Sequence, residues 1–216
     1  MKGPLFLLLF FILLLPEAGR GQVFNKPADL AEAFKSGEAK VLVGFDSRRS
    51  FISRRDVKVF GVRAGLDLQG KARLGFGMYF LRSPFFRTFH WENPAGTRDT
   101  LISQLNFNYM TVFFEPVVLS TKRWEVSVPL HIGIGEAFYR GPKEFAPSTP
   151  KTILLAEGSV IGHYKILPWI GIGGGVGFRQ MLRANTYLRE DFNAPIYMLN
   201  LKLFTGYILR KIFPNI

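Results

Sequence analysis

The 216-residue sequence contains no cysteine. This absence excludes disulfide bonds, thiol chemistry and a cysteine-linked lipid anchor, so stability has to come from packing and backbone pairing. Beyond residue 21 no apolar run reaches 18 residues, which excludes a membrane protein built from transmembrane helices. Three histidines without metal-ligand spacing, and no glycine-rich loop ahead of a helix, give no sign of a metal or nucleotide site. We expect no cofactor and no metal.

Acidic residues are also scarce, because 16 Asp and Glu stand against 28 Lys and Arg, for a formal net charge of +12. A basic chain of this kind can bind nucleic acid, but only if its charge gathers on one helix or sheet face. The basic residues are instead spread along the whole chain. We therefore expect no nucleic-acid partner.

The N-terminus has the features of a signal peptide. Lys2 precedes an apolar run over residues 5–15, and the small residues Gly19 and Gly21 follow it. The run is too short for a spanning helix, which needs about 20 residues. We predict cleavage after Gly21, a short periplasmic N-terminal segment at 22–39, and a single barrel domain at 40–216. The N-terminal segment is either one or two helical turns or a disordered tail.

From residue 40 onward, apolar residues alternate with small or polar ones, the period of two that β-strands show. In the segment 169–181 the apolar set alternates with four glycines, and three further segments repeat the pattern. The apolar sets are Ile170, Ile172, Val176 and Phe178; Tyr197, Leu199, Leu201, Leu203 and Tyr207; Val126, Val128, Leu130, Ile132 and Ile134; and Leu105, Phe107, Tyr109, Thr111 and Phe113.

The small or polar face distinguishes two kinds of barrel. A soluble barrel has a long, charged, solvated outer face, whereas here the polar face consists of Gly, Asn, Ser and single charges that suit a narrow interior. We therefore expect each of these apolar sets to face outward to lipid. A soluble lipocalin-like barrel is the alternative, because alternation alone does not assign inside and outside.

Eight alternating segments are present, at 40–46, 57–68, 71–81, 101–118, 124–139, 152–166, 169–181 and 195–210. Their connections alternate in length, with tight turns at 69–70, 119–123 and 167–168, and long loops at 47–56, 82–100, 140–151 and 182–194. Outer-membrane barrels have short periplasmic turns and longer outer loops. The prediction is an all-β, eight-stranded antiparallel up-and-down transmembrane β-barrel with both termini on the periplasmic side.

Aromatic residues at the segment ends fit the interfacial girdles of such barrels. Trp124 and Trp169 each follow a tight turn, and Tyr207 lies near the end of the last segment. The expected outer girdle comprises Phe80, Phe138, Tyr139 and Phe178.

Together, the signal peptide, the eight segments and the rhythm of loop lengths resemble the small eight-stranded outer-membrane β-barrel proteins of Gram-negative bacteria. The resemblance covers the mature chain and rests on architecture, without a family-specific motif. It implies location in the cell outer membrane.

Charged residues on the inward face have to be paired in a lumen this narrow. We predict a salt-bridged plug with Asp67 and Glu157 among its acceptors, and with a narrow solute channel as the alternative. The predicted lumen network comprises Arg63, Asp67, Arg73, His131, Glu157, His163 and Lys202.

The predicted outer loops suggest two kinds of partner. Arg48, Arg49, Arg54 and Arg55 could hold lipopolysaccharide phosphates, because arginine binds phosphate bidentately, although outer loops are often simply solvated and polar. The loop 82–100 is the candidate surface for an envelope protein partner, since exposed aromatics cost hydration unless covered. Its aromatic residues are Phe85, Phe86, Phe89 and Trp91.

No set of residues has the spacing of a catalytic site. Ser127 and His131 share one strand face but lie about 13 Å apart in an extended chain. The leading expectation is a non-enzymatic outer-membrane barrel that binds or organises envelope lipid or a partner. A narrow solute channel and a lipid-modifying barrel enzyme are the alternatives.

Overall fold

The structure of the protein is a computed structural model that describes residues 39–92, 96, 98–121, 123–141, 148–167, 170–184, 188 and 191–203. For residues 91–92, 98–99 and 202–203 the description is limited to the backbone. The predicted signal peptide, the predicted segment 22–39 apart from Ala39, and the girdle residues Trp169 and Tyr207 lie outside the described residues.

The described part of the chain is almost entirely β-structure. It contains β1 (Ala39–Ile52), β2 (Arg55–Leu68), β3 (Ala72–Leu81), β4 (Phe86–Glu92), β5 (Arg98–Ser120), β6 (Trp124–Ser127), β7 (Leu130–Tyr139), β8 (Lys151–Leu167), β9 (Ile170–Arg183) and β10 (Ala194–Leu203). No helix in these residues has the length and apolar character needed to cross a membrane.

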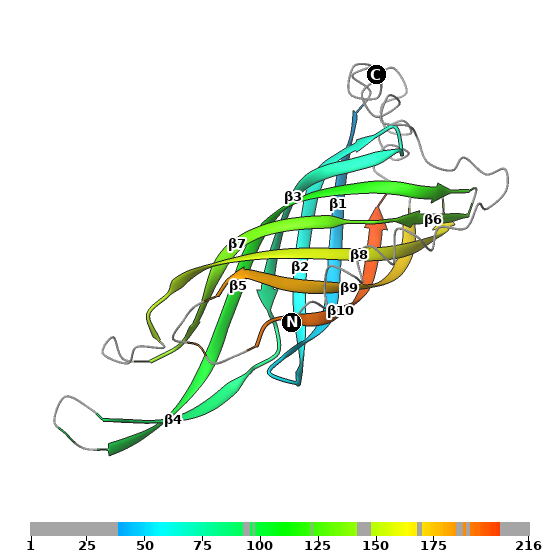
Figure 1. Ribbon diagram of the computed structural model, residues 1–216. Coiled ribbons are helices and arrows are strands. Elements are labelled where there is room, and N and C mark those ends of the chain that lie inside the picture. Colours follow the sequence, from blue (N-terminus) through cyan, green and yellow to red (C-terminus); the bar gives the residue numbers. More distant parts are fainter. Residues whose placement is uncertain are drawn as a thin grey trace, which may run out of the picture.

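The strands close into a ring by antiparallel pairing. Sequence neighbours pair along the sheet, β1 pairs with β10, and β3 pairs with β5 across the excursion that contains β4 (Figure 1). β6 and β7 follow one another along the same strand position between β5 and β8, and β4 lies outside the ring. The ring therefore has eight positions, which confirms the predicted eight-stranded antiparallel up-and-down barrel.

The two ends of the barrel differ. At one end, called here the turn end, the tight turn at Gln69 and Gly70 joins β2 to β3, and β1 begins and β10 ends there. The other end, called the loop end, holds the β1–β2 turn, the β4–β5 hairpin and the chain that precedes β10.

The predicted long loop at 47–56 is wrong. β1 continues to Ile52 and pairs with β2 as far as Arg55, so only Ser53 and Arg54 form the turn. Both have positive φ, 47° and 68°, as the two central residues of a type I′ hairpin turn require. The usual sequence signal for that turn is Asn-Gly or Asp-Gly, and neither is present here.

Two other segment boundaries also differ from the prediction. The predicted loop 82–100 contains β4, which pairs with the first residues of β5 to form a hairpin that projects beyond the ring (Figure 1). The predicted strand 124–139 is divided at Val128 and Pro129, because proline has no N–H to donate to the ladder.

Side-chain alternation places the apolar faces of β7, β9 and β10 outward, as predicted. Ile132 is 67 % exposed and Leu199 is 59 % exposed, whereas their strand neighbours His131 and Asn200 are buried. An outer wall of this composition, around an interior that holds the charges, is the arrangement of a membrane-spanning barrel.

The face assignment of β5 is the opposite of the prediction. Its set of five predicted outward residues, from Leu105 to Phe113, points into the barrel, and Met110, Val112 and Phe114 point outward. Both faces of this stretch carry large apolar residues, so alternation alone could not separate them. The outward-facing asparagines Asn106 and Asn108 lie toward the loop end.

Aromatic side chains mark both ends of the outer wall. At the turn end, Trp124 is exposed and packs edge-on against Tyr164, with ring centroids 5.0 Å apart. Toward the loop end, Phe80 and Phe178 are exposed on the outer wall. The prediction that Tyr139 belongs to this girdle is wrong, because its position on β7 faces inward and the side chain is buried.

Glycines on the inner wall make room for large lumen side chains. A Cβ atom on Gly61 would overlap the ring of Tyr79, a residue that stacks on Tyr109 with centroids 4.9 Å apart. Gly174, by contrast, faces outward, and a Cβ there would meet only Met198 O, at 3.8 Å.

We predict that Gly61→Val destabilises the barrel by about 3 kcal/mol or more, since overpacking a filled interior forces side chains off their rotamers. The measurement is the urea midpoint of the folded, heat-modifiable band on unboiled gels. Gly174→Val is the matched control and should leave that midpoint unchanged. Equal effects of the two substitutions would contradict the assigned faces.

Candidate functional site

The middle of the lumen is held together by ion pairs between arginines and carboxylates. Asp46 Oδ2 lies 3.0 Å from Arg48 Nη2 and 3.2 Å from Arg63 Nε. The Tyr79 hydroxyl lies between the same groups, accepting from Arg48 at 2.6 Å and donating to Asp46 at 3.2 Å. All four side chains are buried, and burial of charges is tolerated only where they are paired.

Toward the turn end, Glu115 joins two arginines. Its two carboxylate oxygens accept separately, one from Arg63 at 2.9 Å and the other from Arg73 at 2.6 Å. Arg73 also contacts Glu125 at 2.7 Å and Asp67 at 2.8 Å, so its guanidinium meets three carboxylates. Because this fork of donors is planar and rigid, it can link several strands at once.

Toward the loop end, Glu157 closes the chain of ion pairs. It pairs with Arg48, accepts from the Tyr109 hydroxyl at 2.9 Å, and lies 3.8 Å from Arg179. Arg179 in turn donates to the Ser50 hydroxyl at 2.6 Å. The result is a continuous network, called here the lumen ladder: Glu157, Arg48, Asp46, Arg63, Glu115, Arg73 and Glu125, with Arg179 and Asp67 attached to it.

Above the lumen ladder, apolar side chains fill the lumen at the loop end. Phe107 stacks on Phe192, which comes from the chain preceding β10, with centroids 5.0 Å apart. Phe85, from the segment between β3 and β4, is buried in the same cluster. Among the described residues, the buried side chains of the lumen thus form two layers, one charged and one apolar.

On the outer wall near the loop end, three cations lie side by side, two on neighbouring strands and the third directly after the end of β3. Arg49 on β1 is directly opposite Lys58 on β2, and the Lys58 carbonyl accepts from the backbone N–H of Arg82 at 2.8 Å. All three side chains are exposed. This set of three is called here the cation row.

An apolar surface begins immediately on the turn-end side of the cation row. Phe60 and Phe80 lie two residues from Lys58 and Arg82 on the same faces, and both are about two-fifths exposed, at 39 % and 43 %. Phe60 also stacks on Phe45, with centroids 6.4 Å apart. The cation row thus lies at the boundary between a polar rim and an apolar wall.

Comparison with known proteins gives structural matches only. The barrel superposes on the N-terminal β-barrel domain of Pseudomonas aeruginosa OprF with a TM-score of 0.51 at 7 % identity, covering 77 % of this chain and 98 % of that one. For neisserial surface protein A the TM-score is 0.51 at 9 % identity, with 76 % and 97 % covered. The Yersinia pestis attachment invasion locus protein Ail, solved with the heparin analogue sucrose octasulfate, gives 0.47 at 12 % identity, with 76 % and 96 % covered.

This is the fold of the small outer-membrane β-barrels. The resemblance expected from the sequence is confirmed at the level of fold. No protein-family model and no curated protein matches the sequence.

Most of the predicted lumen residues lie in one place. Arg63, Asp67, Arg73 and Glu157 belong to the lumen ladder. Two buried histidines lie beside it: His131 is 3.2 Å from the Thr111 hydroxyl, and His163 is 3.8 Å from Glu125. The backbone of Lys202 pairs with Gly44, and its side chain lies outside the description.

The four arginines predicted to hold lipopolysaccharide do not lie together. Arg48 is wrong as a surface candidate, because its position on β1 faces inward and its side chain is buried in the lumen ladder. Arg49 faces outward in the cation row, and Arg54 is exposed at the β1–β2 turn. Arg55 is exposed, donates to the Phe86 carbonyl at 3.2 Å and lies over the Phe85 ring.

The predicted aromatic partner surface is also divided. Phe85 is wrong as an exposed aromatic, since it packs in the loop-end cluster with 5 % exposure. Phe89 is partly buried and packs edge-on against Tyr139, with centroids 4.8 Å apart. Phe86 is exposed, and the side chain of Trp91 lies outside the description.

Sequence reasoning missed five of the nine residues of the lumen ladder, including Arg48, which was assigned to a loop. Glu115 and Arg179 each lie within a stretch of mainly apolar or small residues, where a lone charge is itself a signal of an inward position, whereas Glu125 closely follows Lys122 and Arg123. Asp46 was the last residue of a strand that was predicted too short. Lys58 was not recognised as part of the cation row, because its neighbours Arg49 and Arg82 were assigned to two separate loops.

We predict that Glu115→Gln destabilises the barrel by about 3 kcal/mol, since removing one partner of a buried ion pair leaves uncompensated charge. Here both Arg63 and Arg73 lose a carboxylate. The measurement is the urea midpoint of the folded protein in detergent. Glu136→Gln changes an exposed glutamate on β7 and should have no such effect. A Glu115→Gln variant as stable as that control would show that the lumen ladder does not support the fold.

Proposed function

We propose that this chain is a non-enzymatic outer-membrane β-barrel whose filled lumen is a rigid scaffold and whose outer rim binds the phosphates of lipopolysaccharide. The cation row carries the proposal: three adjacent cations stand where an apolar wall gives way to a polar rim. A glycolipid in the outer leaflet presents its phosphates at that depth.

The direction of insertion follows from the connections. In outer-membrane barrels the short turns face the periplasm and the longer connections face outward. By that rule the loop end, with the projecting hairpin and the cation row, faces the exterior. The apolar wall below the row then lies against the acyl chains of the outer leaflet.

The row places like charges against each other. Like charges directly opposite each other on paired strands are destabilising, and here Arg49 faces Lys58. In the described part of the chain none of the three side chains forms an ion pair with a carboxylate. A bound phosphate would relieve the repulsion, and arginine would hold it with charge-assisted hydrogen bonds.

The two alternative functions have less support. A solute channel needs an open path, whereas the lumen is filled by the lumen ladder and the apolar cluster above it. A lipid-modifying enzyme needs a catalytic group facing the lipid, whereas His131 and His163 are both buried inside the barrel. The third histidine, His90, is on the β4–β5 hairpin.

We predict that the triple substitution Arg49→Ser, Lys58→Ser and Arg82→Ser weakens binding of purified lipopolysaccharide by tenfold or more. A tenfold loss corresponds to about 1.4 kcal/mol, less than a single charge-assisted hydrogen bond can contribute. The measurement is calorimetric titration of the full protein, refolded in detergent micelles, at low and high salt.

A charge-matched triple variant at the turn end is the control. Lys40→Ser, Lys71→Ser and Arg123→Ser remove the same number of cations far from the row, and affinity should stay within twofold of the unsubstituted protein. Equal losses in the two triple variants would indicate attraction by net charge alone and would contradict a defined phosphate site.

We also predict that the protein gives no steady ion conductance in planar bilayers, because buried side chains of the described residues fill the lumen in two layers. The matched measurement uses a double variant, Phe107→Ala with Phe192→Ala, which thins the apolar layer only. Because the lumen ladder remains, this variant should stay closed as well. Sustained conductance of the unsubstituted barrel would favour the channel.

A further inference from the structure

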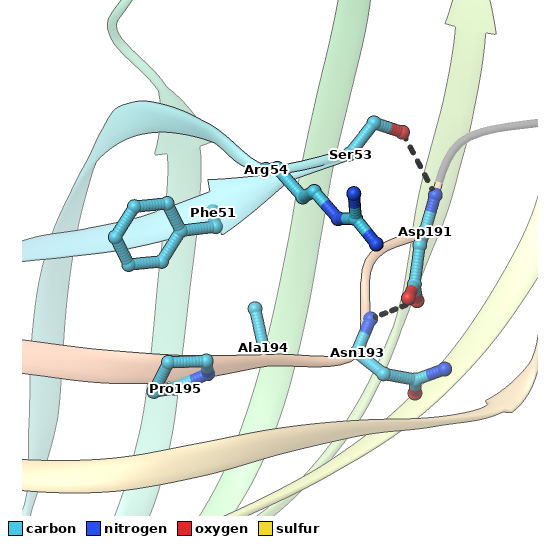
Figure 2. Close-up of a pocket in the computed structure, with 7 residues that line it drawn as sticks. All are labelled: Phe51, Ser53, Arg54, Asp191, Asn193, Ala194 and Pro195. Carbon is cyan, nitrogen blue, oxygen red and sulfur yellow. Dashed lines mark hydrogen bonds between the residues drawn. The ribbon is translucent and has the colours of Figure 1, made fainter.

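A shallow, open pocket of about 620 Å³ lies at the loop end, at the seam between β1 and β10. Phe51 and Arg54 line it on the side of the β1–β2 turn, and Asp191, Asn193 and Pro195 line it on the side that leads into β10 (Figure 2). Phe51 lies two residues beyond Arg49 on the same outward face of β1, so the pocket adjoins the cation row.

The two walls of the pocket are joined by hydrogen bonds. The backbone N–H of Ser53 donates to the Asp191 carbonyl at 2.9 Å, and the Asp191 N–H donates to the Ser53 hydroxyl at 3.1 Å. Asn193 is anchored by its Oδ1, which accepts from the backbone N–H of Met181 at 2.7 Å. The shape of the pocket is therefore set before any ligand binds, which lowers the entropy cost of binding.

The turn that holds Arg54 is strained, and glycine at that position would relieve the strain. Positive φ at a non-glycine residue costs of order 1 kcal/mol, and the second central position of a type I′ turn is the one usually taken by glycine. Arg54 occupies it with φ of 68°. Its guanidinium is exposed and, within the described residues, makes no hydrogen bond or ion pair (Figure 2).

The chemistry of the lining suits a sugar that carries a negative charge. Arg54 offers a fork of donors for an anion, and Asn193 keeps its amide N–H groups for a hydroxyl, since its oxygen is already bonded. The Asp191 carboxylate can accept from further hydroxyls but repels a bare anion. Phe51 and Pro195 supply an apolar surface for the C–H face of a pyranose ring.

We propose that this pocket binds a phosphorylated sugar of the outer-leaflet glycolipid, next to the lipid phosphates held by the cation row. The proposal rests on the proposed function, because it places the two sites on one continuous ligand. The cation row then recognises the lipid-proximal phosphates, and the pocket recognises the saccharide that extends outward from them.

The test is Arg54→Gly in the full protein, because it moves stability and binding in opposite directions. Glycine relieves the positive φ, so the urea midpoint should rise. At the same time, affinity for lipopolysaccharide with a phosphorylated core should fall about tenfold, while affinity for lipid A alone, which lacks the core sugars, should stay the same. Arg140→Gly, an exposed arginine on the far side of the rim, is the matched control and should leave both affinities unchanged.

The possible outcomes separate the two proposals. If Arg54→Gly weakens lipid A binding as much as core binding, Arg54 is one more cation of the rim, and the sugar pocket is overturned. If Arg54→Gly changes neither affinity while the triple variant of the cation row lowers both, the pocket fails and the proposed function stands. If none of these variants changes lipopolysaccharide affinity, both proposals fail.

Discussion

The structure depends on one constraint: a closed ring of eight strands leaves an interior that side chains fill, so each charge directed inward has to find its partner there. In the lumen ladder, single carboxylates meet this constraint by pairing with two arginines each. Glu115 divides its two oxygens between Arg63 and Arg73, and Asp46 lies between Arg48 and Arg63. The network also crosses the lumen, since Arg48 on β1 reaches Glu157 on β8. The ion pairs thus connect strands that share no backbone hydrogen bonds.

Because the lumen charges of the described residues pair with one another, the outer wall can be apolar over most of its height, and departures from that pattern carry information. The cation row is such a departure, since nothing in the barrel's own construction requires Arg49 and Lys58 to face each other. The projecting β4–β5 hairpin is another, with Phe86 and Ile102 exposed outside the ring. Features that bind ligands are expected on the rim and loops rather than in the scaffold.

The sequence was sufficient to predict the ring, because alternation, small inward residues and tight turns act locally. The prediction failed where the local sequence pattern fits two structures equally well. The outward face of β5 carries Asn106 and Asn108 before it becomes apolar at Met110, and only Glu115, on the same face as Phe113, shows which face is inside. The β1–β2 turn lacks the glycine that usually marks it. The partners within the lumen ladder could not be predicted, because Arg48 and Glu157 are 109 residues apart and meet only after closure.

The region from Arg48 to Arg55 shows how the interior determines the rim. Four arginines occur within eight residues, and strand geometry gives them different environments: Arg48 enters the lumen ladder, Arg49 faces outward, Arg54 lies in the turn, and Arg55 contacts the segment that leads into β4. A shift of β1 by one residue would exchange the faces of Arg48 and Arg49. Glu157 would then lose Arg48, and Arg63 would lose Asp46, so the ion pairs that β1 makes with other strands fix the register that presents Arg49. The buried network therefore positions the exposed site, although no residue of the ladder touches the surface at which we propose the ligand binds.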